Sequence, residues 1–110
     1  MKFACLVYLE TDKLHAVPDR ECMDCGDAFR QSGVMLGGEA LHPVTAAATV
    51  RVRNGKATIT DGPFAETKEQ LAGFYLLEAA NLDEAIQLAA KIPPAREGSI
   101  EVRPVRDLAP

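Results

Sequence analysis

An Asn-Gly pair at positions 54 and 55 constrains the fold of this chain more than any other feature of its sequence. It separates two stretches of alternating apolar and polar residues, and Asn-Gly readily adopts the positive φ angles of a type I′ turn. With a two-residue turn, Arg53 pairs with Lys56, and the other pairs follow outward. This register places Val50, Val52, Ala57 and Ile59 on one face of a β-hairpin, and Arg51, Arg53, Lys56 and Thr58 on the other.

Two β-α-β units flank this hairpin. Asp19 is the candidate N-cap of the first helix, and Gly33 is placed to end that helix. Asn81 is the candidate N-cap of the second helix, with Glu84 in the capping-box position. Before the hairpin, the predicted elements are a strand at 3–9, a helix from 19 to about 32, a short strand at 34–36, and a loop or irregular strand at 37–43. After the hairpin come a loop at 61–70, a strand at 71–78, a helix between Asn81 and Pro93, and a strand at 99–105. The second helix has an apolar stripe of Leu82, Ala85, Ile86 and Ala89.

This order predicts an α+β fold, with a ferredoxin-like antiparallel sheet, two helices on one face and an added β-hairpin, in a single domain over residues 1–110. The first strand is apolar at odd and even positions alike. In a later strand, Phe74 and Leu76 point opposite to Tyr75 and Leu77. Strands buried on both faces have such continuous apolar runs. Because no element is left to cover the second face, we expect a homodimer in which a second copy covers it.

Composition and charge exclude several classes of protein. The net charge of −4 argues against a general nucleic-acid-binding protein, which would need a basic stripe. The basic residues form no run that could hold an acidic membrane surface, and no apolar stretch approaches the ~20 residues of a membrane span. The N-terminal apolar run soon meets Glu10 and Asp12, so we expect no export signal. Three cysteines without an export signal indicate the reducing cytoplasm.

The run Asp61-Gly62-Pro63-Phe64-Ala65-Glu66-Thr67-Lys68-Glu69 resembles the signature of the DGPF branch of the YCII-related family. The segments at 37–39, 48–51 and 101–104 are also similar to this family, so the resemblance spans nearly the whole chain. It implies a dimeric α/β-barrel fold. This agrees with the order of elements predicted from the residues alone.

The resemblance implies less about chemistry. Enzymatic activity has been suggested for other members from a histidine–aspartate pair, and that branch has its histidine on the first helix. The first predicted helix of this chain has no histidine and carries Cys22 and Cys25 instead, so the pair is not carried over. Some relatives are linked to sigma-factor systems, which implies a regulatory accessory role as the alternative to an enzyme.

Charged side chains make the segment from Asp61 to Glu69 a candidate site. In one interpretation, Asp61 bonds backbone N–H groups two residues on and only shapes the turn. In the other, Asp61 is a general base, Lys68 stabilises an oxyanion and Glu66 binds substrate. A solvated ion pair in a loop has the same sequence pattern and contributes little stability.

Residues on both sides of the hairpin extend this candidate site. His42 precedes Pro43, which favours an extended loop, and an imidazole there could carry protons near neutral pH or lie on plain surface. Because His42 and Asp61 flank the hairpin, we expect them to converge. Glu39 lines the same cavity or is a surface charge at a strand end, and Arg51 binds an anion or lies on a solvated face. The catalytic candidates are therefore Asp61, His42 and Lys68, and the substrate-binding candidates are Glu66, Glu39 and Arg51.

Cys22 and Cys25 form a C-x-x-C motif near the start of the first predicted helix. A redox motif needs this spacing at a helix N-terminus, where the thiol pKa is lowered. The two cysteines share one helical face with Phe29, which favours burial as small apolar side chains. No second ligand pair has a matching spacing, so we predict no metal and no other cofactor.

Three functions fit these patterns, in decreasing order of support. The first is a small-molecule-binding domain, acting as an acid–base enzyme if the candidate residues converge. The second is a non-catalytic regulatory or protein-interaction module, associated with sigma factors as the resemblance implies. The third is a thiol redox protein. The patterns name neither a substrate nor a reaction.

Overall fold

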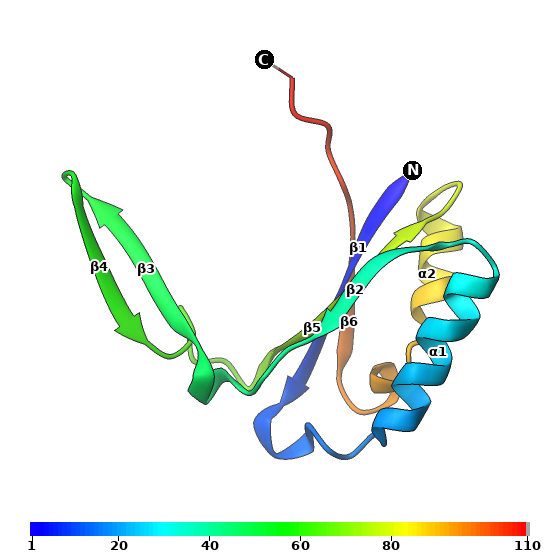
Figure 1. Ribbon diagram of the computed structural model, residues 1–110, viewed down its shortest axis with the longest axis horizontal. Helices are drawn as coiled ribbons and strands as arrows, with labels where there is room; N and C mark the ends of the chain where they lie inside the picture. The colour runs from blue at the N-terminus through cyan, green and yellow to red at the C-terminus, as the bar shows by residue number, and fades with distance from the viewer. Residues whose placement is uncertain (110) are drawn as a thin grey trace.

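A four-stranded antiparallel sheet carries both long helices on one of its faces (Figure 1). The computed structural model describes residues 1–109. The strand order β2-β5-β1-β6, with one helix in each β-α-β unit, makes the fold α+β and ferredoxin-like, as predicted. The strands of this sheet are β1 (Lys2–Glu10), β2 (Met35–Ala40), β5 (Glu69–Glu78) and β6 (Ser99–Pro104), the helices are α1 (Asp19–Gln31) and α2 (Leu82–Ala89), and short 3-10 helices lie at Thr11–Lys13, Val44–Ala46 and Pro93–Arg96.

Strand β1 lies inside the sheet and supplies much of the core. Successive side chains of a strand point to opposite faces, so its odd-numbered residues share one face. These residues are buried beneath the helices: Phe3, Cys5, Val7 and Leu9. The main core cluster joins three of them to buried residues from the helix side of the fold, namely Phe29, Leu77, Ala89 and Ile92.

The ends of the two helices lie at or next to the predicted capping residues. Asn81 is the N-cap of α2, and its side chain accepts a hydrogen bond of 2.9 Å from the backbone N–H of Glu84. For α1 the predicted cap is wrong by one position, because Pro18 occupies the N-cap and Asp19 is the first helical residue. Gly33 has a φ of 81° just beyond the end of α1, as a helix-ending glycine requires.

Strand β2 decides between the two alternatives for residues 37–43, because 37–40 form an irregular strand and 41–43 lie beyond its end. Residues 37–40 are paired with β5, after a register shift between Met35 and Gly37. A Cβ atom on Gly38 would lie 2.8 Å from the carbonyl oxygen of Phe74, so the close approach of the strands requires glycine there. The sequence left both alternatives open because the strand propensity of glycine depends on tertiary neighbours, which here favour the strand.

Helix α2 corrects a second expectation. Ala85 and Ala89 of the predicted apolar stripe are buried, but Leu82 and Ile86 are 47% and 49% exposed. The partly buried Leu88 packs against the core. The helix is therefore rotated so that its small residues face the sheet, and an apolar pair remains at the surface.

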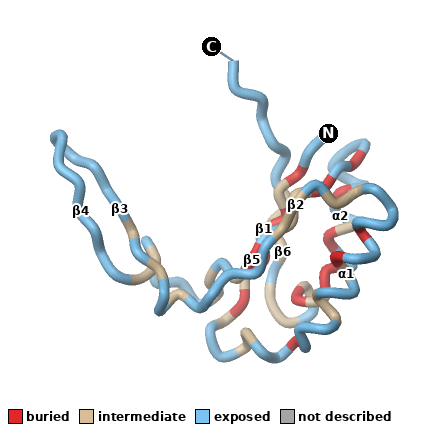
Figure 2. Tube along the Cα trace, in the orientation of Figure 1, coloured by how far each residue is buried: buried red, intermediate tan, exposed pale blue. Residues whose placement is uncertain are grey.

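The hairpin forms as predicted but stands apart from the main sheet (Figure 1). It consists of β3 (Ala48–Arg53) and β4 (Lys56–Asp61), with Arg53 opposite Lys56 and Val50 opposite Ile59. The turn residues have φ angles of 54° at Asn54 and 76° at Gly55. Figure 2 shows the hairpin as almost entirely exposed, while buried residues lie in the sheet and helices.

The second face of the main sheet is apolar. Even-numbered residues of β1 point away from the helices, and cross-strand partners share a face. The pairs on this face are Ala4 with Leu76, Leu6 with Phe74, and Tyr8 with Leu71. Leu71 and Phe74 are 38% and 37% exposed. Figure 1 shows the helices on one side of the sheet and the hairpin on the other. We call this surface, made of Ala4, Leu6, Tyr8, Leu71, Phe74 and Leu76, the open sheet face.

Candidate functional site

A cleft of about 720 Å³ lies between α1 and the edge of the sheet formed by β2 and β5. Its apolar lining includes Val7, Leu9, Leu14, Val17, Met35 and Ala72. Its polar lining comes from both walls and includes Asp19, Asp27, Arg30, Glu39, His42 and Tyr75. Sites for small organic molecules are concave, mostly apolar and about 300–1,000 Å³ in volume, with a few polar groups that fix orientation. The cleft matches that description.

The sheet wall of the cleft presents Glu39 and His42. Glu39 lies in β2, and its position is fixed by pairing with Phe74 of β5. The next residue after β2, Leu41, donates its backbone N–H to the carbonyl oxygen of Ala72 at 2.9 Å, which holds the chain against β5 up to the residue before His42. Both Glu39 and His42 are exposed at the rim of the cleft, but Glu39 shares the face of its cross-strand partner Phe74, so its side chain points toward the open sheet face.

The helix wall presents Arg30 and Asp27. Gly26 is buried, and a Cβ atom there would lie 3.4 Å from Nη1 of Arg30, so the guanidinium group rests over the glycine. Nη1 of Arg30 also donates to Oδ1 of Asp27 at 2.9 Å. Both side chains are more than half exposed, and exposed pairs of this kind contribute little stability. An anionic ligand could therefore compete with Asp27 for the guanidinium group.

Tyr75 lies between the cleft and the core. Its ring meets Phe29 edge to face, with ring centroids 5.9 Å apart. Burial, followed by the neighbouring thiols of Cys25 and Cys22, raises the pKa of Tyr75 to about 12. The phenol therefore stays protonated at neutral pH. It can donate a hydrogen bond to a ligand but does not act as a phenolate base.

Cys22 and Cys25, the cysteines of the C-x-x-C motif, lie on α1 and are neighbours of Tyr75. Cys22 lines the cleft, while Cys25 packs against the core and its thiol donates to the carbonyl oxygen of Lys91 at 3.6 Å. Burial raises the pKa of the Cys22 thiol, with smaller contributions from Asp19 and Glu21. Burial likewise raises the pKa of Cys25. The thiolate is the reactive form, so this environment disfavours thiol chemistry at neutral pH.

The first half of the predicted signature loop forms the base of the hairpin. Asp61 is the last residue of β4, opposite Ala48, and it is exposed. Gly62 follows with a φ of 101° and donates its N–H to the carbonyl oxygen of Ala47 at 2.7 Å. The hydroxyl of Thr49 donates to the carbonyl oxygen of Gly62 at 2.9 Å. These bonds close the base of the hairpin through glycine.

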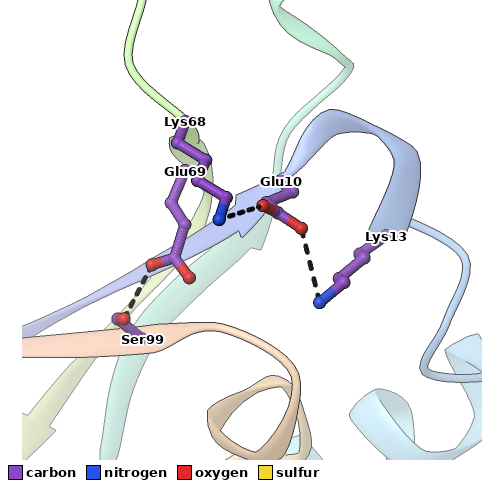
Figure 3. Close-up of polar contacts among 5 residues, drawn as sticks. All are labelled: Glu10, Lys13, Lys68, Glu69 and Ser99. Carbon is purple, nitrogen blue, oxygen red and sulfur yellow. Dashed lines mark hydrogen bonds and ion pairs between the residues drawn. The ribbon is translucent and has the colours of Figure 1, made fainter.

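The second half of the loop is held at the end of β1 (Figure 3). Nζ of Lys68 lies 3.3 Å from Oε1 of Glu10, and Nζ of Lys13 lies 3.3 Å from Oε2 of the same carboxylate. Hydrogen bonds from Lys13 first, and then from Lys68, lower the pKa of Glu10. Nearby, the hydroxyl of Ser99 donates to Oε1 of Glu69 at 2.7 Å. The charge of Lys68 is thus directed at Glu10.

The predicted site residues fall into two groups. Glu39 and His42 line the cleft together. Among the residues that the structure describes, the remaining four candidates do not line it: Arg51 and Asp61 of the hairpin, and Glu66 and Lys68 of the loop that leads to β5. The expected convergence of His42 with Asp61 stays a prediction.

Tyr75, Arg30, Asp27 and Asp19 of the cleft were not among the residues that the sequence indicated. One signal was available. A glycine inside a helix costs about 1 kcal/mol relative to alanine, so Gly26 marked a position where another group approaches α1 closely. That group is Arg30, one turn further along the same helix. Tyr75 had no local signal, because its exposure to the cleft depends on how β2 ends.

Two further observations describe residues 1–109. No helix in this part of the chain is long and apolar enough to cross a membrane. Across the same residues, no three His, Cys, Asp or Glu side chains are grouped in a way that could hold a metal ion.

Comparison with known proteins gives a family and one curated relative. The family model described as the YCII-related domain matches residues 1–109. An uncharacterized protein of Rhizobium meliloti (strain 1021) is 55% identical over 67 residues, which are 59% of this chain and 54% of that protein. The chain therefore spans about half the length of the curated relative that it matches.

Proposed function

The chain belongs to the YCII-related domain family, and we propose that it binds a small organic molecule in the cleft between α1 and the β2–β5 edge. The observation that carries this proposal is the cleft itself, with about 720 Å³ of space, an apolar lining and polar groups on both walls. The phenol of Tyr75, whose pKa is raised, is a neutral hydrogen-bond donor, and Arg30 supplies a positive charge. A planar or partly apolar molecule with one acidic group fits these features.

In an enzymatic version of this proposal, His42 transfers the proton. His42 lines the cleft, and its imidazole can accept a proton from a bound ligand and return it. Asp61, Lys68, Glu66 and Arg51 lie outside the cleft of their own chain. A role for them in the reaction therefore requires a second copy that brings them to it.

A homodimer is part of this proposal. The open sheet face leaves Leu71 and Phe74 more than one third exposed, and a second copy packed sheet to sheet would cover them. We also assign the chain to the DGPF branch of the family, on the run from Asp61 to Phe64. Cytoplasmic localisation is supported by the cysteines Cys5, Cys22 and Cys25, all of which are free.

The test is a thermal-shift screen against a library of small carboxylic acids and phosphate esters. We expect at least one compound to raise the Tm of the wild type, and the shift to be lost in His42→Ala and Arg30→Ala. The matched controls are Asp61→Asn and Arg51→Ala, which alter charged groups outside the cleft and should keep the shift. A shift lost in the controls but kept in the two cleft variants would move the site to the hairpin and its loop.

A non-catalytic interaction module is the second candidate function. The observation that favours it is the projecting hairpin, whose Val50, Val52 and Ile59 are each at least 60% exposed. Exposed apolar faces of this kind mark interaction sites. This function would be favoured if no compound binds the cleft and the hairpin variants alone change association with another molecule. The thiol redox function has no comparable support, because burial raises the pKa of both cysteines of the C-x-x-C motif.

A further inference from the structure

We propose that the β3–β4 hairpin is a clasp that closes on a second copy of this chain through its apolar face. This face consists of Val50, Val52, Ala57 and Ile59, which share one side of the hairpin. The inference rests on the homodimer proposed above and adds to it a second contact surface, separate from the open sheet face. The same face occurs on both copies, so a two-fold axis makes each hairpin clasp the other protomer.

The first support is the absence of cover over these side chains within their own chain. Val50 is 62% exposed, Val52 60% and Ile59 71%. A two-stranded hairpin is marginally stable by itself in water, and it needs a further strand, a helix or another surface to become stable. Yet apolar and polar residues alternate along both of its strands, and its turn residues, Asn54 and Gly55, have the positive φ angles that the turn requires. The sequence thus specifies an apolar surface that residues 1–109 do not cover.

The second support is the shape of the protomer. The radius of gyration is 15.6 Å, whereas a compact domain of this length would have a value of about 13 Å. The molecule measures 46 × 42 × 19 Å. Figure 1 shows that the hairpin contributes to this extension together with the C-terminal segment after β6, and that the hairpin projects away from the sheet on the side opposite the helices. The hairpin and the open sheet face therefore lie on the same side of the molecule, where one partner can contact both.

The third support is charge, which favours a second copy over a nucleic acid or an acidic membrane. Residues 48–60 contain Arg51, Arg53 and Lys56 and no acidic residue. The whole chain has 12 Lys and Arg against 16 Asp and Glu, so the rest of the molecule has 9 basic and 16 acidic residues, a formal charge of −7. The basic side chains lie on the polar face of the hairpin, opposite the apolar contact, so they add a longer-range attraction to the acidic body of the other copy and take no part in the contact itself. A nucleic acid or an acidic membrane would be repelled by that body.

The test compares single charge insertions on the two faces of the same strand. Ile59→Asp places a carboxylate in the proposed contact, and Thr58→Asp places the same group on the opposite, polar face. We expect Ile59→Asp to raise the dimer dissociation constant by about tenfold or more, and Thr58→Asp to change it by less than about twofold. Sedimentation velocity from nanomolar to high-micromolar protein measures both constants. Far-UV circular dichroism checks that each variant keeps its fold.

Hydrogen–deuterium exchange provides a second measurement. The backbone amides of residues 48–61 should be protected at protein concentrations above the dissociation constant and should exchange rapidly below it, because an isolated hairpin opens readily. Ile59→Asp should remove this protection at high concentration. The amides of β1 and β5 should change much less with dilution.

The variant Leu71→Asp, on the open sheet face, separates this inference from the homodimer itself. If Leu71→Asp weakens the dimer but Ile59→Asp and Thr58→Asp both leave it unchanged, the homodimer stands and the clasp is wrong. If the wild type is monomeric at every concentration, both are wrong. If Ile59→Asp weakens the dimer and removes the concentration-dependent protection while Thr58→Asp does neither, the clasp is confirmed.

Discussion

The body of the molecule and its hairpin follow equally clear local rules, yet they differ in what holds them together. In the body, Cys5 and Leu77 have no exposed surface, and helices cover one face of the sheet. In the hairpin, the apolar residues Val50, Val52 and Ile59 are more than half exposed. A strand pattern and a good turn therefore fix a conformation, whereas burial against other elements determines how stable that conformation is.

The two regions also differ in the role of glycine. Gly98 lies against β1, and a Cβ atom there would collide with the carbonyl oxygen of Tyr8. Gly55, at the hairpin tip, has no atom within 4 Å of its Cβ position and is needed for its φ of 76°. One glycine permits packing between elements, and the other permits a local turn.

The largest expected contrast comes from truncating one buried and one exposed apolar side chain. Leu77→Ala should lower the free energy of unfolding by about 2–5 kcal/mol, because it leaves a cavity in the core. Ile59→Ala should change it by less than about 0.5 kcal/mol in the monomer, because that side chain is already in water. Urea denaturation at low protein concentration measures both. Equal losses would show that the hairpin and the body unfold as one packed unit.

Alkaline pH should destabilise the body through Cys5. Burial raises the pKa of this thiol from 9.0 to about 11. Between these values the unfolded chain loses the thiol proton while the folded chain keeps it, so stability falls as the pH rises. The loss should reach about 2–3 kcal/mol above pH 11. The difference in unfolding free energy between wild type and Cys5→Ala isolates it, and a difference independent of pH would contradict the burial of Cys5.

Adding a methyl group to each of the two glycines should separate global from local effects. Gly98→Ala should cost about 1–3 kcal/mol of global stability, because the backbone of β1 must move. Gly55→Ala should cost about 1–2 kcal/mol within the hairpin alone, because alanine disfavours positive φ. Hydrogen exchange should then rise in residues 48–61 with the urea midpoint unchanged. Faster exchange in β1 of Gly55→Ala would contradict the independence of the two regions.

The smallest effect concerns the ionic contact between the body and the loop that returns from the hairpin. The pKa of Glu10 is lowered by hydrogen bonds from Lys13 first and Lys68 second. Its contribution to stability is therefore present above the ordinary pKa of 4.5 and is lost as the pH falls through the lower folded value. Glu10→Gln should flatten the acid limb of the stability curve, Lys13→Ala should do so less, and Lys68→Ala least. Urea midpoints across the acid range test this order, and 1 M salt should weaken it.

The parts of the fold that depend on near neighbours could be predicted from the sequence. The hairpin register, the N-cap at Asn81 and the helix end at Gly33 involve residues a few positions apart. For residues 37–40 the sequence left a loop and an irregular strand open, and pairing with β5 decides for the strand. The prediction was wrong for Leu82 and Ile86, because the rotation of α2 that buries Ala85 and Ala89 leaves these two side chains at the surface.

For the candidate site, only Glu39 and His42 were predicted and also lie in the cleft. They were found because a charged residue after paired glycines and a histidine before a proline are locally unusual. Arg30 and Tyr75 were not found, since an arginine on a helix and a tyrosine in a strand are ordinary until the opposite wall is in place. Residue type alone does not reveal which side chains share a cavity.

The sequence by itself determined the turn at Asn54 and Gly55, the pairing of β3 with β4, the order of the elements and the apolar character of both sheet faces. Each of these follows from backbone preferences and side-chain alternation over short distances. Only the tertiary structure decided which sheet face the helices cover, that α1 and the end of β2 enclose a cleft, and that the hairpin projects from the body. These depend on strands that meet across long stretches of chain, where packing and not local preference sets the arrangement.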